Sequence, residues 1–237
     1  MYKKIHHPSP NFEDRPEGVL IDTIILHYTD MRNAEEALER LSDPQAKVSA
    51  HFLIHKNGNV YQLVDPYYKA WHAGESYWQG DKDLNNRSIG IELDNAGHAF
   101  GLEPFSEIQI TTLINLLKDL VEVFEVPVNR IIGHSDVAPL RKQDPGELFP
   151  WFDLAEKGFG LWPQSLEPFQ TSPLPPLSVS DAQQAFLKIG YECPQTGTWD
   201  ENTQKVCRVF QQHFTPHEVT GQITNLTHQT LLALLQK

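Results

Sequence analysis

The chain has 237 residues, a formal net charge of −12 and 40% hydrophobic residues, a composition typical of a soluble globular protein. The acidic balance argues against a nucleic-acid partner and against attraction to an anionic membrane surface, because both need basic patches. No stretch approaches the roughly 20 apolar residues of a membrane-spanning helix. We therefore predict no transmembrane segment, while the oligomeric state stays open.

The N-terminal segment MYKKIHHPSPNF has two lysines but lacks the apolar run that a signal peptide needs after them. We therefore expect a cytoplasmic location; if a leader has been removed, the alternative is the periplasm or the outer membrane. The two cysteines, Cys193 and Cys207, are too few for a disulfide framework and lack the spacing of a zinc site. They do not indicate a compartment.

Predicted strands and helices follow one another in the first part of the chain. The β-branched run at 19–28 predicts a strand that is buried on both faces. Residues 33–41 predict a helix with Asn33 as its N-cap. Residues 51–64 predict a hairpin, because two apolar runs flank the turn-forming dipeptide Asn57-Gly58.

The same alternation continues to residue 134. Residues 88–93, SIGIEL, predict another strand, and 106–125 predict the clearest helix, with Ser106 and Gln109 in the pattern of a capping box. Residues 129–134 predict the last strand. Mixed strands and helices indicate an α/β fold with a mixed central β-sheet that is flanked by helices.

The composition changes after residue 162. We predict three regions: an α/β domain at 1–162, a Pro-rich, semi-rigid linker at 163–177 and a small helical domain at 178–237. Three helices are expected in the last region: one near 180–189 that is capped by Ser180 with Gln183, one at 201–213 and one at 227–235.

The helical region contains an internal repeat. TGTWDENT at 196–203 and TGQITNLT at 220–227 both follow the pattern Thr-Gly-x-apolar-x-x-x-Thr, and each leads into a predicted helix. Glycine suits the turn and the polar residues can cap the helix that follows. The repeat predicts a compact three-helix module.

Two histidines lie where buried strands end. His27 closes TIILH and His134 closes RIIGH, and strand ends are where sites form in open α/β sheets. Asp144 follows in a loop stiffened by Pro139 and Pro145. A single histidine is usually an ordinary surface or core residue, but two imidazoles and a carboxylate match a catalytic zinc site, whose fourth position is left for water.

Glu92 and Lys142 each allow a structural and a functional interpretation. Glu92 lies within an apolar strand, where it either pairs with a cation at the edge of the core, faces water, or acts as a general base. Lys142 is either a solvated loop lysine or a cation that stabilises the oxyanion of a tetrahedral intermediate.

Several blocks, taken together, resemble the zinc-dependent N-acetylmuramoyl-L-alanine amidases of the type 2 family, in its AmpD/AmiD branch. These blocks are IILHYT, SAHFLI, AWHAG, NNRSIGIEL and GHSDVAPLRKQDPGELFPW, and they run in family order across about residues 20–160. The C-terminal unit resembles the small peptidoglycan-binding domain that is often attached to such enzymes, on the basis of the repeat and of VFQ at 209–211.

The resemblance implies a zinc enzyme that hydrolyses the amide between N-acetylmuramic acid, or its 1,6-anhydro form, and L-alanine of the stem peptide. It implies Zn²⁺ ligands at His27, His134 and Asp144, a catalytic acid/base at Glu92 and a transition-state lysine at Lys142. The partner would be peptidoglycan or muropeptide fragments. The alternative is a non-catalytic muropeptide recognition protein of the same fold, which the loss of a zinc ligand would favour.

One position departs from some members of the family. A tyrosine that assists catalysis in related proteins precedes the histidine of the HF block, and here this position is Ala50. The resemblance therefore leaves the role to Glu92, and we expect His51 to point into the core or to organise the site.

The segment AWHAGESYWQG at 70–80 is rich in aromatic residues and glycine. One interpretation is a packed loop with Trp71 in the core. The other is a substrate groove in which Trp71, His72, Trp78 and Asn85 bind sugar or peptide, since aromatic faces pack against sugar rings.

Overall fold

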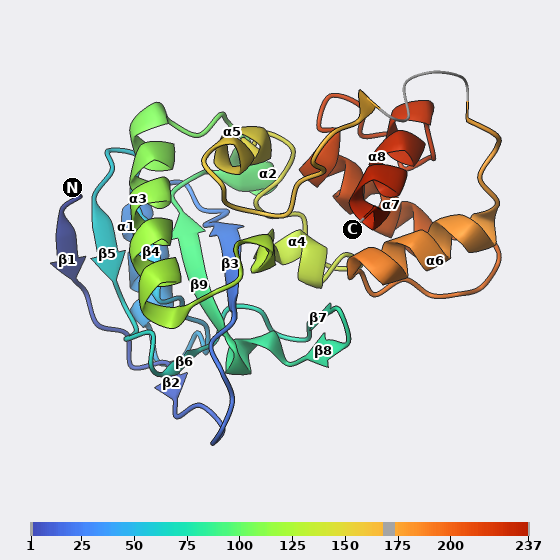
Figure 1. The fold of residues 1–237 in the computed structure, drawn as a ribbon. Helices are drawn as coiled ribbons and strands as arrows, with labels where there is room; N and C mark the ends of the chain where they lie inside the picture. Colours follow the sequence, from blue (N-terminus) through green and yellow to red (C-terminus); the bar gives the residue numbers. More distant parts are fainter. Residues whose placement is uncertain (1, 168–173, 237) are drawn as a thin grey trace.

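The computed structural model describes residues 2–167 and 174–236 as an α/β unit followed by a group of three helices (Figure 1). The α/β unit is built on a six-stranded sheet with the order β1-β5-β4-β9-β3-β10. Its neighbouring strands run parallel, except β4 and β5, which are antiparallel. In that order the strands are Lys4–His6, Val60–Gln62, Phe52–Ile54, Ser88–Leu93, Thr23–Tyr28 and Ile131–Gly133.

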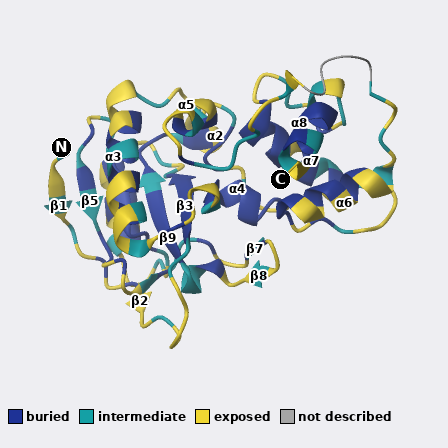
Figure 2. Ribbon diagram, in the orientation of Figure 1, coloured by how far each residue is buried: buried dark blue, intermediate teal, exposed yellow. Residues whose placement is uncertain are grey.

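Strands β3 and β9 form the centre of the sheet, and their side chains are almost all buried (Figure 2). β-Branched apolar side chains suit this position because both faces of the sheet are covered. Pairing with β9 begins at Thr23, so the predicted strand at 19–28 is too long at its start. Leu20 lies before the paired region and is 76% exposed.

Helices cover both faces of the sheet, which confirms the predicted α/β architecture. Helix α3 (Glu107–Phe124) packs on the face to which Ile24 and Leu26 point. Helix α1 (Ala34–Ser42) packs on the opposite face, against Leu53. Side chains alternate along a strand, so His27 emerges on the face opposite α3.

The predicted helix caps are partly correct. Asn33 caps α1 by accepting a hydrogen bond from the backbone of Glu36, and Ser106 caps α3 in the same way. The capping box is incomplete, because the side-chain amide of Gln109 donates instead to the carbonyls of Ile54 and Asp94.

The predicted hairpin is present, but its connection is longer than a two-residue turn. Ile54 pairs with Val60, so residues 55–59 form the loop, and Gly58 has a positive φ of 84°. The remaining short elements are β2 (Phe12–Glu13), β6 (Lys69–Ala70), β7 (Tyr77–Trp78), β8 (Asp81–Lys82), η1 (Leu84–Asn86), α2 (Gly97–Phe100), η2 (Val128–Arg130), α4 (His134–Val137) and α5 (Trp151–Glu156).

The three C-terminal helices are α6 (Val179–Ile189), α7 (Glu201–Phe214) and α8 (Asn225–Leu235). This confirms the predicted three-helix module. The cap of α6 is Ser178 and not Ser180, because the Ser178 hydroxyl accepts from the backbone of Asp181. The predicted domain limits stay predictions, and residues 168–173 of the expected linker lie outside the described residues.

The internal repeat corresponds to two equivalent turns, each held by a buried glutamine. The Gln183 side chain accepts from the backbone of Gly197 and donates to Thr203, at the turn before α7. Gln211 accepts in the same way from Gly221 at the turn before α8. Each turn therefore needs a glutamine from the preceding helix.

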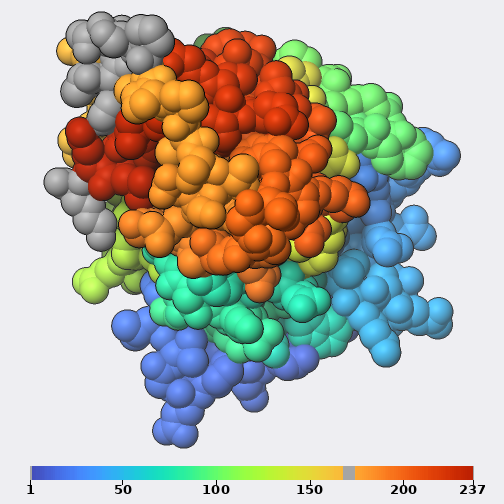
Figure 3. Space-filling view, turned by 90° about the vertical axis from the view of Figure 1, so that its right-hand side faces the viewer, coloured from blue at the N-terminus to red at the C-terminus, as the bar shows by residue number. Residues whose placement is uncertain are grey.

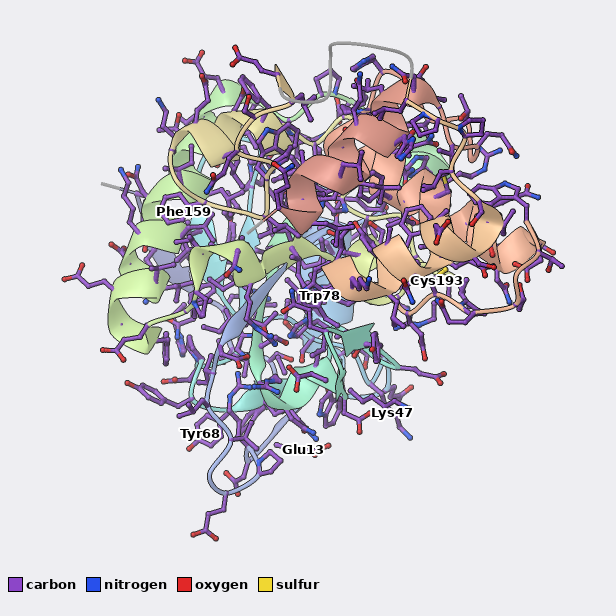
Figure 4. The ribbon with its side chains drawn as sticks, turned by 45° about the vertical axis from the view of Figure 1, so that its right-hand side comes forward. Glu13, Lys47, Tyr68, Trp78, Phe159 and Cys193 are labelled. Atoms are coloured by element: carbon purple, nitrogen blue, oxygen red, sulfur yellow. The ribbon has the colours of Figure 1, made fainter. Side chains whose placement is uncertain are left out.

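The two units share one apolar core. Trp78 from β7, labelled in Figure 4, is fully buried. Its ring lies edge-on to that of Tyr191, with ring centroids 5.1 Å apart. Ile25 and Ile132 from the sheet belong to the same cluster as Phe186 of α6. The C-terminal helices lie against the segment around β7 and β8 in the space-filling view (Figure 3). In the described ranges, no helix is both long and apolar enough to cross a membrane.

We predict that Gly190→Ala destabilises the chain more than Gly158→Ala. Both glycines have positive φ, so alanine costs about 1–3 kcal/mol of strain at either position. Only at Gly190 would the new methyl group also approach Trp78, at 2.8 Å, which adds about 1–3 kcal/mol. Urea unfolding measures the difference, and equal losses for the two variants would contradict the shared core.

Candidate active site

Two neighbouring parallel strands bring His27 and His134 together at their carboxyl-terminal ends. His27 is the fifth residue of β3, and His134 follows β10 directly as the first residue of α4. β3 and β10 are parallel, with Leu26 opposite Gly133, so the two histidines leave the sheet side by side. This is the position at which sites form in α/β sheets.

Asp144 reaches the two histidines because its loop folds back on α4. The backbone of Ser135 donates to the Asp144 carbonyl at 2.8 Å, and the backbone of Lys142 donates to the Ala138 carbonyl at 3.0 Å. These bonds close the loop into a compact turn, and they direct the Asp144 carboxylate toward the ends of β3 and β10.

The three side chains meet through one atom each. His27 Nδ1 lies 2.9 Å from His134 Nδ1 and 3.0 Å from Asp144 Oδ2, and His134 Nδ1 lies 2.9 Å from the same oxygen. The three residues are 2%, 3% and 6% exposed, respectively. Such a convergence of ligand atoms is suited to a metal ion.

The other ring nitrogens have separate partners that orient the imidazoles. His134 Nε2 donates to the carbonyl of Ala73 at 3.1 Å, and His27 Nε2 lies 3.1 Å from His72 Nδ1. Both rings therefore turn their Nδ1 atoms toward the Asp144 carboxylate. Outer partners of this kind are typical of histidines that bind metals.

The charge states also suit a metal site. Burial, together with the neighbouring His134 ring, lowers the pKa of His27 to about 4, so this imidazole is neutral at pH 7. Burial would raise the pKa of Asp144, but the charge and hydrogen bonds of His134 and His27 hold it well below its usual range. Two imidazole nitrogens and one carboxylate oxygen form a donor set that fits a divalent metal ion.

Glu92 is the cross-strand neighbour of His27 in the pairing of β3 with β9. It lines the same cleft, and its Oε2 atom is buried with no hydrogen-bond partner among the described residues. Burial, reinforced by the Asp144 charge, raises the pKa of Glu92 well above its usual range. A carboxylate with a partnerless oxygen beside the converging His-His-Asp cluster suits proton transfer. The salt-bridge alternative is not supported, because Glu92 forms no ion pair within the described ranges.

The cleft around these groups has a volume of about 330 Å³. Lys142 lines it beside Asp144, and residues of α1 and of the loop before β7 complete its walls. Trp71 also lines the cleft, and its Nε1 is buried without a partner among the described residues. The predicted substrate contact of Trp71 is thus compatible with its position but stays a prediction.

His72 lines the cleft, but both of its ring nitrogens are already engaged. Nδ1 faces His27, and Nε2 lies 3.2 Å from the hydroxyl of Ser88. Gly90 leaves the space for this ring, since a methyl group there would come within 2.4 Å of His72 Cγ. The structure therefore places His72 against His27, and the predicted substrate contact of His72 stays a prediction.

His51 organises the site from the core, as expected. Its Nδ1 accepts from the backbone of Gly90 at 2.9 Å, and Nε2 lies 3.0 Å from the Tyr68 carbonyl. Burial, aided by the nearby Arg15 charge, lowers the pKa of His51 to about 3. Ala50 is fully buried beside it.

One predicted substrate contact, Trp78, is wrong, and another, Asn85, stays a prediction. Trp78 is fully buried in the core that joins the two units, so its ring does not reach the cleft. Asn85 uses its side-chain oxygen to accept from the backbones of His72 and Ala73. It therefore shapes the loop that carries His72.

Sequence reasoning did not identify Arg141, which lines the cleft, or Arg15, whose guanidinium lies 3.2 Å from His51 Nε2 behind it. The Arg141 guanidinium donates to the carbonyls of Ala73 and Glu75, which fixes the carbonyl that orients His134. Arg15 donates to the carbonyls of Pro66 and Ser88, far along the chain. Only the position of Arg141, next to Lys142, could have served as a signal.

Comparison with known proteins identifies two family matches. The N-acetylmuramoyl-L-alanine amidase model matches residues 16–147, which include His27, His134 and Asp144. A peptidoglycan binding domain model matches residues 177–231. Both matches confirm the resemblances that the sequence motifs indicate.

Relatives match along most of the chain. The N-acetylmuramoyl-L-alanine amidase AmiD of Escherichia coli is 35% identical over 233 residues, 92% of this chain and 83% of AmiD. A solved AmiD structure, in complex with anhydro-N-acetylmuramic acid-L-Ala-D-gamma-Glu-L-Lys, has a TM-score of 0.83 at 33% identity, covering 94% of this chain and 93% of that one.

Another solved structure, AMPDH3 from Pseudomonas aeruginosa, has a TM-score of 0.81 at 31% identity and covers 94% of each chain. The 1,6-anhydro-N-acetylmuramyl-L-alanine amidase AmpD of Haemophilus influenzae is 33% identical over 161 residues, 60% of this chain and 85% of AmpD. With its family match, its fold and its converging His-His-Asp cluster, the chain belongs to the N-acetylmuramoyl-L-alanine amidase family.

Proposed function

We propose that the chain is a zinc hydrolase that cleaves the amide between N-acetylmuramic acid, or its 1,6-anhydro form, and L-alanine of the stem peptide. The observation that carries this proposal is the convergence of His27, His134 and Asp144 next to Glu92. The similarity to AmiD, solved with an anhydro-muramyl peptide, supports the same substrate class.

Zinc suits the cluster because two imidazole nitrogens and one carboxylate oxygen are the donor types of catalytic zinc sites. A bound zinc ion would supply Lewis acidity and would lower the pKa of a bound water from about 15.7 toward about 7. His134 is held for this task by the Ala73 carbonyl, and His27 by His72.

In the proposed reaction, Glu92 accepts a proton from the attacking water and passes it to the leaving nitrogen of L-alanine. Its raised pKa and its partnerless Oε2 suit both steps, because a carboxyl whose pKa is raised holds an accepted proton long enough to pass it on. Lys142 lines the same cleft and would place its ammonium group near the oxyanion of the tetrahedral intermediate.

A non-catalytic recognition protein is the alternative function. Such a protein needs the cleft but not the complete set of reacting groups. Here the three metal-cluster side chains meet, and Glu92 and Lys142 line the same cleft. The full set therefore favours the enzyme.

We predict that the chain releases stem peptides with a free L-alanine amino group from muramyl peptides. The substrates to test are purified anhydro-muropeptides and whole sacculi, with products identified by mass spectrometry. The relative rates on the two would indicate whether the enzyme acts on fragments or on intact wall. If neither substrate is cleaved at the lactyl amide, the proposed function is wrong.

Removal of the metal should abolish this cleavage. Dialysis against a chelator is expected to reduce the rate to background, because the water would lose its activating ion, and one equivalent of zinc should restore it. Metal content and activity are measured on the same samples. Full activity in metal-free protein would contradict the proposal.

Glu92→Gln should keep zinc and lose roughly 10²–10⁴ in rate, because the amide cannot accept a proton. Glu122→Gln, on the exposed face of α3, is the matched control and should retain the wild-type rate.

The pH profile adds a second readout. Burial raises the pKa of Glu92, and the base works only when it is deprotonated, so wild-type kcat/KM should rise with pH through this raised pKa. The residual activity of Glu92→Gln should lack this acidic limb. An unchanged limb in the variant would assign the titration to another group.

A further inference from the structure

A buried aspartate links the His27-His134-Asp144 cluster to the C-terminal helices. Asp136 lies in α4, two residues after His134, and is 1% exposed. Helix α4 lies between the sheet and the C-terminal unit (Figure 1). Burying a carboxylate costs several kcal/mol unless hydrogen bonds compensate, so its partners matter.

Three donors surround the Asp136 carboxylate. Oδ2 accepts from the backbone of Gly133 at 2.7 Å and from His213 Nδ1 at 2.8 Å, and Oδ1 accepts from the Tyr191 hydroxyl at 2.7 Å. Only Gly133 belongs to the α/β unit. Two of the three partners of this carboxylate therefore come from the C-terminal unit.

The two C-terminal donors are themselves held in place. The His213 ring stacks on Trp151, with centroids 3.9 Å apart, and its Nε2 lies 3.2 Å from the Leu161 carbonyl. Tyr191 is fully buried against Trp78. Burial beside Asp136 raises the pKa of Tyr191, so its hydroxyl keeps its proton and remains a donor.

Through Asp136 these donors act on His134, which belongs to the His27-His134-Asp144 cluster. The Asp136 carboxylate bonds to Gly133, and His134 lies between the two. Its backbone is therefore fixed from both sides, while its Nδ1 points to His27 and Asp144. A shift of the carboxylate would move the His134 ring with it.

We propose that the C-terminal unit is a structural part of the metal centre, in which Tyr191 and His213 hold Asp136 and thereby position His134. All three are positioning residues, since none of them belongs to the converging cluster itself. The inference rests on the proposed zinc site and adds a role for a unit whose family model concerns peptidoglycan binding.

The test compares Tyr191→Phe and His213→Phe with Tyr2→Phe in the full-length chain. The first two remove one donor to Asp136 and keep an aromatic ring. The control removes a similar bond, from Tyr2 to Asp119 at 2.6 Å, near the N-terminus. Zinc affinity is measured by competition with a chromophoric chelator, at a temperature at which all variants are folded.

We expect zinc to bind about tenfold more weakly to Tyr191→Phe and His213→Phe, as for other outer partners of metal ligands, and with unchanged affinity to Tyr2→Phe. Hydrogen exchange in the metal-free chains is the second readout. The amides of residues 133–137 should exchange faster in the first two variants, whereas a merely stabilising role would not single out this segment.

Wild-type zinc affinity together with wild-type exchange at 133–137 in both variants would overturn the proposal. Neither readout uses substrate, so the test is independent of catalysis. A chain that binds zinc and shows these effects without cleaving muramyl peptides would refute the proposed function while supporting this inference.

Discussion

The structure depends on one constraint: one potential metal-ligand atom from each of three side chains must meet at a single buried point. His27, His134 and Asp144 converge within 3.0 Å, and the opposite nitrogen of each imidazole has its own partner. The parallel pairing of β3 with β10 and β9 makes this possible, because it places His134 and Glu92 on either side of His27. A shift of one residue in the register of either pairing would move His134 or Glu92 to the other face of the sheet, away from His27.

The second feature is how the site is supported from outside the α/β unit. Trp78 and Tyr191 form a shared core, and Asp136 joins the His134 segment to the C-terminal helices by hydrogen bonds. A unit of this kind is often regarded as a tethered binding module. Here its contacts reach within two residues of His134, so the C-terminal unit and the His27-His134-Asp144 cluster share one framework.

Local patterns predicted much of the fold and of the candidate site. Strand ends at His27 and His134, the apolar strand around Glu92 and the Pro-stiffened loop of Asp144 were visible in the sequence, and the structure brings these side chains together; their catalytic roles stay predictions. Trp78 was misplaced because an aromatic residue in a glycine-rich loop packs equally well on a sugar or in a core. The partners of Asp136 lie 55 and 77 residues further along the chain, a distance at which no local periodicity operates.

Anomalous X-ray diffraction at the zinc absorption edge, on crystals of the chain with one equivalent of zinc, tests the central claim most directly. The account predicts one strong peak, within bonding distance of His27 Nδ1, His134 Nδ1 and Asp144 Oδ2. The absence of a peak at this point, with zinc bound elsewhere, would contradict it.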